Sequence, residues 1–168
     1  IDLSRPQVMG IVNATPDSFS DGGSHPTPQA ALVHCEALLR AGADILDIGA
    51  ESTRPYGGAE AVSLDEEMRR LEPVLPAILE LGVPVSIDTM KADVAASALK
   101  AGAAIVNDVW GLRADPLLAG VAAKYKTPVI LMHNRSNPAS VDVREKLGNA
   151  YIGSEYQNLI EDVKRELL

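Results

Sequence analysis

The chain has little of what secreted, membrane-spanning or nucleic-acid-binding proteins depend on. Among its 168 residues there is one cysteine, Cys35, which cannot form an internal disulfide and is interpreted as a packing residue in a reducing cytoplasm. No apolar run approaches the ~20 residues of a membrane helix, and the polar start does not match a signal peptide. The net charge of −8 argues against binding to nucleic acid or anionic membranes.

Apolar strands alternate with helices along the whole chain. Strands are expected at residues 8–12, 44–50, 83–87, 103–106 and 128–132, and helices at 28–41, 64–81, 91–101, 115–125 and 151–168. A glycine, an apolar strand and a polar residue recur in that order at 42–47, 82–88 and 102–107. Near-continuous apolar strands separated by helices predict a parallel sheet.

Local signals define several helix ends. Thr27 is a suitable N-cap for the first helix, and Ser63 caps the second with Glu66 as its capping-box partner. Pro73 and Pro76 predict a kink or a restart within that second helix.

Two architectures suit this pattern: an open doubly wound sheet, or part of a (β/α)8 barrel. The glycine-rich fingerprint of dinucleotide-binding sheets does not follow the first strand. A polar residue at the end of every strand suits a barrel, in which each strand end contributes to one ligand site. We therefore favour an α/β fold of the TIM-barrel type. It would be incomplete, with about five βα units (strands one to five), because a whole barrel needs about 250 residues.

Polar side chains at the strand ends are the candidates for chemistry. They are Asn13, Glu51, Ser52, Thr53, Arg54, Asp88, Asn107, Asp108 and His133. A carboxylate beside an amide suits a planar heterocycle that carries N–H donors and a carbonyl group. A guanidinium suits a phosphate or a carboxylate. Each candidate also has a structural interpretation, and in particular Asn13 could begin a turn and Asp88 could cap the following helix.

Other kinds of site find little support. The three histidines lack zinc-ligand spacing, and neither a G-x-S-x-G elbow nor a Walker loop occurs. The charged residues of 65–70 are interpreted as a solvated helix face.

Five segments resemble the signatures of the dihydropteroate synthase family. Residues 9–23, MGIVNATPDSFSDGG, resemble its first signature, and residues 51–55, ESTRP, resemble its second. Residues 86–89, 106–108 and 131–135 match the family's third, fourth and fifth strand ends. The resemblance spans almost the whole chain and implies the N-terminal part of a single pterin-binding (β/α)8 barrel domain over residues 1–168.

The resemblance implies a transferase of folate biosynthesis. Enzymes of this family join p-aminobenzoate to 6-hydroxymethyl-7,8-dihydropterin diphosphate, release pyrophosphate and form 7,8-dihydropteroate, and sulfonamides compete with the aminobenzoate. By resemblance, Asp88 and Asn107 hold the pterin ring, and Val109 and Met132 pack near it.

The remaining roles concern the diphosphate, Mg²⁺ and the aminobenzoate. Asn13 is implied at the Mg²⁺–pyrophosphate end of the site. Thr53 and Arg54 are the implied catalytic residues, which meet the diphosphate and help to shape the aminobenzoate site. Phe19 and Pro55 line that pocket.

The chain departs from the family pattern in places. The second loop is slightly longer than the commonest form, and Ala50 replaces a usual glycine. Strands six to eight, which carry further ligand-binding residues and the surface of the expected homodimer, are absent from this chain. We therefore expect these 168 residues alone to be inactive. The alternatives are a pterin- or methyltetrahydrofolate-binding barrel and a non-catalytic fragment.

Overall fold

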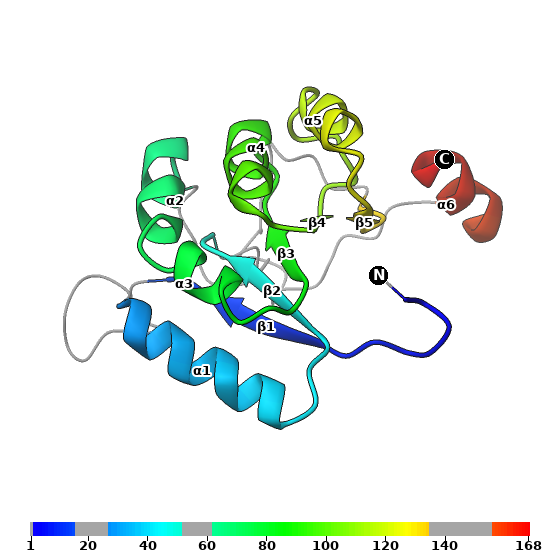
Figure 1. Cartoon of the computed structure of the whole chain (residues 1–168). Helices are drawn as coiled ribbons and strands as arrows, with labels where there is room; N and C mark the ends of the chain where they lie inside the picture. Colours follow the sequence, from blue (N-terminus) through cyan, green and yellow to red (C-terminus); the bar gives the residue numbers. More distant parts are fainter. Residues whose placement is uncertain (1, 16–26, 52–61, 135–155) are drawn as a thin grey trace, which may run out of the picture.

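A curved parallel sheet with helices around its outer side forms the fold (Figure 1). This computed structural model describes residues 2–15, 27–51, 62–134 and 156–168. The strands are β1 Met9–Asn13, β2 Ile45–Gly49, β3 Val85–Asp88, β4 Ile105–Asp108 and β5 Val129–Leu131. The helices are α1 Pro28–Arg40, α2 Leu64–Leu71, α3 Leu75–Leu79, α4 Ala92–Ala101, α5 Leu118–Tyr125 and α6 Leu159–Leu167.

The strand order distinguishes the two expected architectures. All neighbouring strands are parallel, and they lie side by side in the order of the sequence from β1 to β5. A doubly wound sheet reverses its strand order at a switch point, whereas a barrel adds each new strand to the same edge. The incomplete TIM barrel of five strands is confirmed.

The two faces of the sheet differ because side chains alternate along each strand. Leu46, Ile48, Ile87 and Val106 are fully buried in the main hydrophobic core, under the helices. The opposite face, which is the inner face of the barrel, carries mostly polar side chains from β2, β3 and β4. No helix in the described parts of the chain is long and apolar enough to cross a membrane.

Cys35 packs in the core, as expected. Its thiol on α1 is fully buried and unpaired. Burial raises the pKa of this thiol to about 11, so it remains protonated and unreactive near neutral pH.

The predicted N-caps are confirmed. The Thr27 hydroxyl accepts a hydrogen bond from the Ala30 backbone N–H at 3.3 Å, and the Ser63 hydroxyl accepts one from the Glu66 N–H at 3.2 Å. The two prolines divide the second helix into α2 and α3, so the restart is also confirmed, with Pro76 in the first turn of α3.

The last two predicted helices begin too early. The helix expected from Asp115 begins at Leu118, and the helix expected from residue 151 begins at Leu159, although residues 151–155 lie outside the described residues. Asn158 starts α6 because its side-chain oxygen accepts a hydrogen bond from the Glu161 N–H at 3.2 Å.

Asp115 caps the start of α4. Its Oδ2 accepts a hydrogen bond from the Ala92 N–H at 2.8 Å, in the first turn of α4, and its Oδ1 accepts one from the Leu117 N–H at 2.9 Å. The α4 N-cap residue, Lys91, makes no side-chain capping bond itself. Asp115 therefore joins the starts of two neighbouring helices.

We expect Asp115→Ala to lower the free energy of unfolding by about 1–2 kcal/mol, because it leaves two helix-start N–H groups without their acceptor. Urea denaturation followed by circular dichroism measures this change. The control is Asp65→Ala, which removes an exposed carboxylate from α2 and should change stability by less than about 0.5 kcal/mol. Equal effects of the two substitutions would contradict the capping role of Asp115.

Candidate ligand-binding site at the strand ends

The strand register brings four residues into one row at the carboxyl ends of β1 to β4. Asn13 is the register partner of Gly49, Gly49 is that of Asp88, and Asp88 is that of Asn107. We call these four residues the strand-end row. Three of the candidates named from sequence, on three different strands, therefore lie in one row.

Asp88 is the one carboxyl group in the strand-end row, and its pKa is raised. Burial, together with the negative charges of Asp47, Asp108, Glu67 and Glu51, raises its pKa to about 7. The alternative that Asp88 caps the following helix is not observed, because the Ala92 N–H at the start of α4 bonds to Asp115. Asp88 can therefore serve a ligand.

Gly49 makes room for the Asp88 carboxylate. A Cβ atom at position 49 would lie 3.2 Å from Asp88 Oδ2 and 3.3 Å from Asp88 Cβ, tighter than ordinary van der Waals contact. Sequence reasoning did not select Gly49. A glycine that ends a strand between polar strand ends is the signal that could have identified it.

Asn107 is held by a carboxylate two strands away. Its side-chain Nδ2 donates a hydrogen bond to Asp47 Oδ2 at 2.9 Å, across the intervening strand β3. Sequence reasoning missed Asp47, although a carboxylate within an otherwise apolar strand is a recognisable signal. Burial raises the pKa of Asp47, and the neighbouring Ser86 and Asn107 side chains oppose that shift.

Asp108 proves to be structural. It follows Asn107 in β4, so its side chain points to the other face of the sheet and is fully buried. Its two oxygens accept hydrogen bonds from the backbone N–H groups of Trp110 at 2.9 Å and Leu112 at 2.6 Å. Asp108 therefore holds the turn after β4, in which Leu112 has a φ of 62°.

The candidates that follow β4 and β5 differ in how exposed they are and in what they contact. Met132 is 46% exposed, and Val109 is partly buried. His133 Nε2 lies 2.8 Å from Glu166 Oε2 on α6. The other sequence-predicted residues, Phe19, Ser52, Thr53, Arg54 and Pro55, lie outside the described residues.

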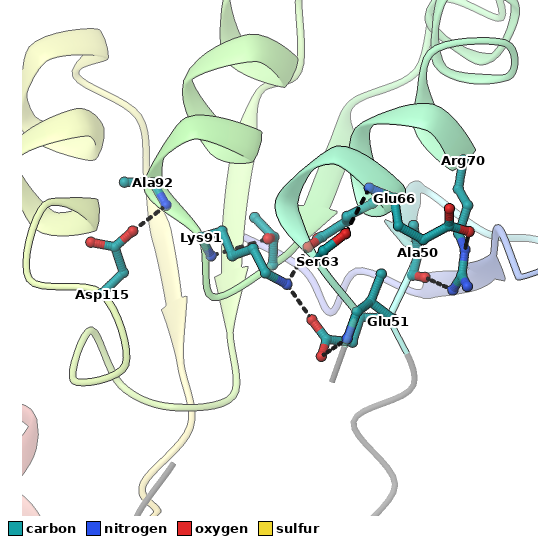
Figure 2. Close-up of polar contacts among 11 residues, drawn as sticks. Ala50, Glu51, Ser63, Glu66, Arg70, Lys91, Ala92 and Asp115 are labelled. Carbon is teal, nitrogen blue, oxygen red and sulfur yellow. Dashed lines mark hydrogen bonds and ion pairs between the residues drawn. The ribbon is translucent and has the colours of Figure 1, made fainter. Parts of the chain in front are cut away.

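A lysine between two glutamates fixes the chain after β2 (Figure 2). Lys91 Nζ lies 2.5 Å from Glu51 Oε2 and 2.6 Å from Glu67 Oε2. Burial lowers the pKa of Lys91, but its hydrogen bonds to the two glutamates outweigh this effect and the pKa is raised overall. Lys91 is therefore a cation that stabilises two carboxylates of the site.

Side chains of Arg70 and Glu51 bind the backbone on the two sides of residues 52–61. Arg70 donates a hydrogen bond from Nη1 to the Ala50 carbonyl oxygen at 2.8 Å, and Glu51 Oε1 accepts one from the Val62 N–H at 3.1 Å (Figure 2). The side chain of Glu51 thus joins the residue before this segment to the residue after it.

The prediction that the charged residues of 65–70 form a solvated helix face is wrong in part: Asp65 and Arg69 are exposed, but two other members are not. Glu67 is fully buried, and the Arg70 side chain is only 17% exposed. Glu66 accepts a hydrogen bond from Arg70 Nε at 2.7 Å and also pairs with Arg69. This face is charged because it binds Lys91 and the Ala50 carbonyl group, and both partners come from other parts of the chain.

The described residues provide few ligands for a metal ion. They contain no group of three His, Cys, Asp or Glu side chains arranged to hold one. Asn13 is exposed at the end of β1 and offers a single amide oxygen. That donor fits a Mg²⁺ ion that keeps several waters and is bound chiefly by the phosphates of a substrate.

A parallel sheet of barrel type whose strand ends gather a carboxylate and an amide belongs to the class of α/β proteins that form ligand sites at the carboxyl ends of their strands. Comparison with known proteins identifies the class more closely. The family model for pterin binding enzymes matches residues 9–167. The chain belongs to this family.

The similar proteins are dihydropteroate synthases, and the resemblance read from the motifs is confirmed. The enzyme of Bacillus subtilis is 51% identical over 158 residues, which cover 94% of this chain and 52% of that protein. The enzyme of Clostridium beijerinckii is 47% identical over 97% of this chain and 54% of its own length. The chain therefore spans about half the length of these relatives.

Solved structures agree with this comparison. A crystal structure of the Clostridium difficile dihydropteroate synthase in the presence of pteroic acid matches with a TM-score of 0.80 and 44% identity, covering 98% of this chain and 56% of that one. The Xanthomonas albilineans enzyme with 4-aminobenzoic acid matches with a TM-score of 0.79 and 43% identity. The match covers 98% of this chain and 54% of that one.

We expect Lys91→Met to destabilise the fold by about 3–5 kcal/mol, because it leaves the buried Glu67 carboxylate without its cation. Adding Glu67→Gln should recover part of that loss, since the remaining buried group is then neutral. Urea denaturation measures both variants against Lys100→Met, which removes an exposed lysine from the same helix. A loss in Lys91→Met no larger than in this control would contradict the role of Lys91.

The raised pKa of Asp88 predicts a pH-dependent stability. The folded state favours the protonated carboxyl group, so the stabilisation it contributes is complete below about pH 4 and is lost as the pH rises through about 7. Asp88→Asn should therefore be more stable than the parent at pH 8, on the order of a few kcal/mol, and this advantage should shrink toward pH 4.

Urea denaturation at several pH values measures this difference, with the exposed Asp93→Asn as the charge-matched control. A difference between Asp88→Asn and the parent that does not change with pH would contradict the assignment.

Proposed function

We propose that this chain is the pterin-binding part of a dihydropteroate synthase. The reaction joins p-aminobenzoate to 6-hydroxymethyl-7,8-dihydropterin diphosphate and gives 7,8-dihydropteroate and pyrophosphate. The observation that carries the proposal is the pair of Asp88 and Asn107, register partners at the ends of β3 and β4. This pair lies in a chain that is 51% identical to the Bacillus subtilis dihydropteroate synthase over 94% of the length of this chain.

The proposed ligand matches the chemistry of the pair. One edge of a pterin ring presents N–H and amino groups beside a carbonyl group. A carboxylate accepts two N–H bonds, and an amide both accepts and donates. Asp88 and Asn107 are both partly exposed, so they can reach a ligand on the inner face. Val109 and Met132 follow β4 and β5 and would pack against the ring.

Thr53 and Arg54 would bind the diphosphate and shape the aminobenzoate site, with Phe19 and Pro55 lining it. The support from the structure is indirect: Glu51, which precedes these residues in the second signature, is fixed by Lys91 and by the Val62 N–H. Asn13 and the phosphate oxygens would hold Mg²⁺, which when bound supplies positive charge to the leaving group.

The chemical step breaks the bond between the pterin methylene carbon and the diphosphate oxygen. The aminobenzoate nitrogen forms a new bond to that carbon and then loses a proton to solvent, while pyrophosphate leaves as the anion. Arg54 would stabilise the negative charge that grows on the leaving group. The arylamine needs position more than a strong base, so no residue of this chain is assigned as a general base.

We also infer that the full protein acts in the cytoplasm as a homodimer, without nucleic-acid or membrane partners. The buried thiol of Cys35 supports the compartment, and the net charge of −8 supports the lack of nucleic-acid and anionic-membrane partners. Size-exclusion chromatography with light scattering on the full protein would test the dimer.

The test of the function is an assay of the full protein that contains this chain, with both substrates and Mg²⁺. We expect dihydropteroate and pyrophosphate to form in equal amounts. Asp88→Asn should weaken binding of 6-hydroxymethylpterin by about 5- to 150-fold, because a ring donor loses its charged acceptor. Calorimetry measures this change, with the exposed Asp93→Asn as the control.

Two outcomes would contradict the proposal. If the full protein binds the pterin but shows no pyrophosphate-dependent binding of p-aminobenzoate, it is a folate-binding barrel instead. If it does not bind the pterin at all, the assignment of the strand-end row to this ligand fails.

A further inference from the structure

The inner face of β2 contains a buried carboxylate that the proposed reaction does not use. Asp47 is 5% exposed and lies between the apolar residues Leu46 and Ile48. Its Oδ2 accepts the hydrogen bond from Asn107, but Oδ1 has no hydrogen-bond partner among the described residues. A buried carboxylate without a cation costs stability, so an apolar residue would serve the fold alone better.

The contact between Asp47 and Asn107 spans two strands. The register partner of Asp47 is Ser86 on β3, and the register partner of Asn107 is Asp88 on the same strand. The hydrogen bond therefore crosses β3 diagonally, between Ser86 and Asp88. Ser86 is fully buried and small, which leaves space for this crossing.

The chemistry of the contact determines how the Asn107 amide is oriented. An ionised carboxylate has no hydrogen to donate, so it can only face the NH₂ group of an amide. With Nδ2 turned to Asp47, the carbonyl oxygen Oδ1 of Asn107 must point away from Asp47. Without Asp47 the amide could rotate by 180° and present its NH₂ group in place of the carbonyl.

We propose that Asp47 is a positioning residue, which holds the Asn107 amide in the one orientation that presents its carbonyl oxygen to N–H donors of the ligand. This inference rests on the proposed function, because the donors are those of a pterin ring. Asp88 and Asn107 then both offer acceptors, and the pair selects a ring edge that carries donors over one that carries acceptors.

The negative charge of Asp47 also raises the pKa of Asp88. The groups that raise the pKa of Asp88 by their negative charge are Asp47 on β2, Asp108 on β4, Glu67 on α2 and Glu51 after β2. Removing the charge of Asp47 should lower the pKa of Asp88 and so move the pH midpoint of ligand binding downward.

The test uses the full protein with 6-hydroxymethylpterin as the probe in calorimetry. Asp47→Leu, which removes the acceptor, should weaken binding about tenfold or more. Asn107→Ala should weaken it similarly, and the double variant should bind no worse than Asn107→Ala, because Asp47 acts through Asn107. The control Asp93→Asn should stay within about twofold of the parent.

Asp47→Asn provides the second measurement, because it keeps the shape of the side chain and so protects the test against a loss of folding. It should weaken binding and lower the pH midpoint. Unchanged binding in Asp47→Asn and Asp47→Leu, or losses that add in the double variant, would overturn the proposal.

A third readout does not depend on the ligand. Hydrogen exchange of the Asn107 side-chain NH₂ group, followed by NMR, should be slow in the parent and about tenfold faster or more in Asp47→Leu. Equal exchange rates would overturn the positioning role. Slow exchange in a parent that does not bind the pterin would instead contradict the proposed function and leave the Asp47–Asn107 contact intact.

Discussion

The gathering of negative charge at the strand ends is the constraint on which the rest of the structure depends. Glu51, Asp47, Asp88, Asp108 and Glu67 lie close enough for four of them to raise the pKa of Asp88. Each is accommodated differently. Asp108 accepts two backbone N–H bonds, Glu51 and Glu67 share one lysine, and Asp47 accepts the amide of Asn107. Asp88 is the carboxylate that we propose binds the ligand.

This arrangement connects the two halves of the candidate site. On one side, Glu67 on α2 pairs with Lys91, the N-cap residue of α4, and Lys91 in turn pairs with Glu51, which leads into residues 52–61. On the other side, β2 and β4 supply Asp47 and Asn107. Strand β2 therefore contributes to both proposed binding regions. Glu51 follows its end and precedes the proposed anion-binding residues, and Asp47 on its inner face binds Asn107 of the proposed pterin-binding pair.

Features that depend on near neighbours in the chain were predictable. The caps at Thr27 and Ser63 join residues three positions apart, and the restart at Pro76 follows from its own ring. The parallel sheet followed from repeated apolar strands, and the row of Asp88 and Asn107 followed because parallel strands end at the same edge. The sequence alone therefore determined the fold class, most of the element order and two members of the site.

The tertiary structure decided the roles of the charged residues. Glu67 looked like part of a solvated helix face, but its counter-charge, Lys91, lies 24 residues further along the chain. Asp47 was recognised only as a polar residue of a strand, and its partner Asn107 lies 60 residues away. A pattern of residue types indicates which face a side chain occupies but not which opposite charge or donor meets it there. The free energy of a buried charge depends on that partner, so only the folded arrangement shows which carboxylates are structural and which one can receive a ligand.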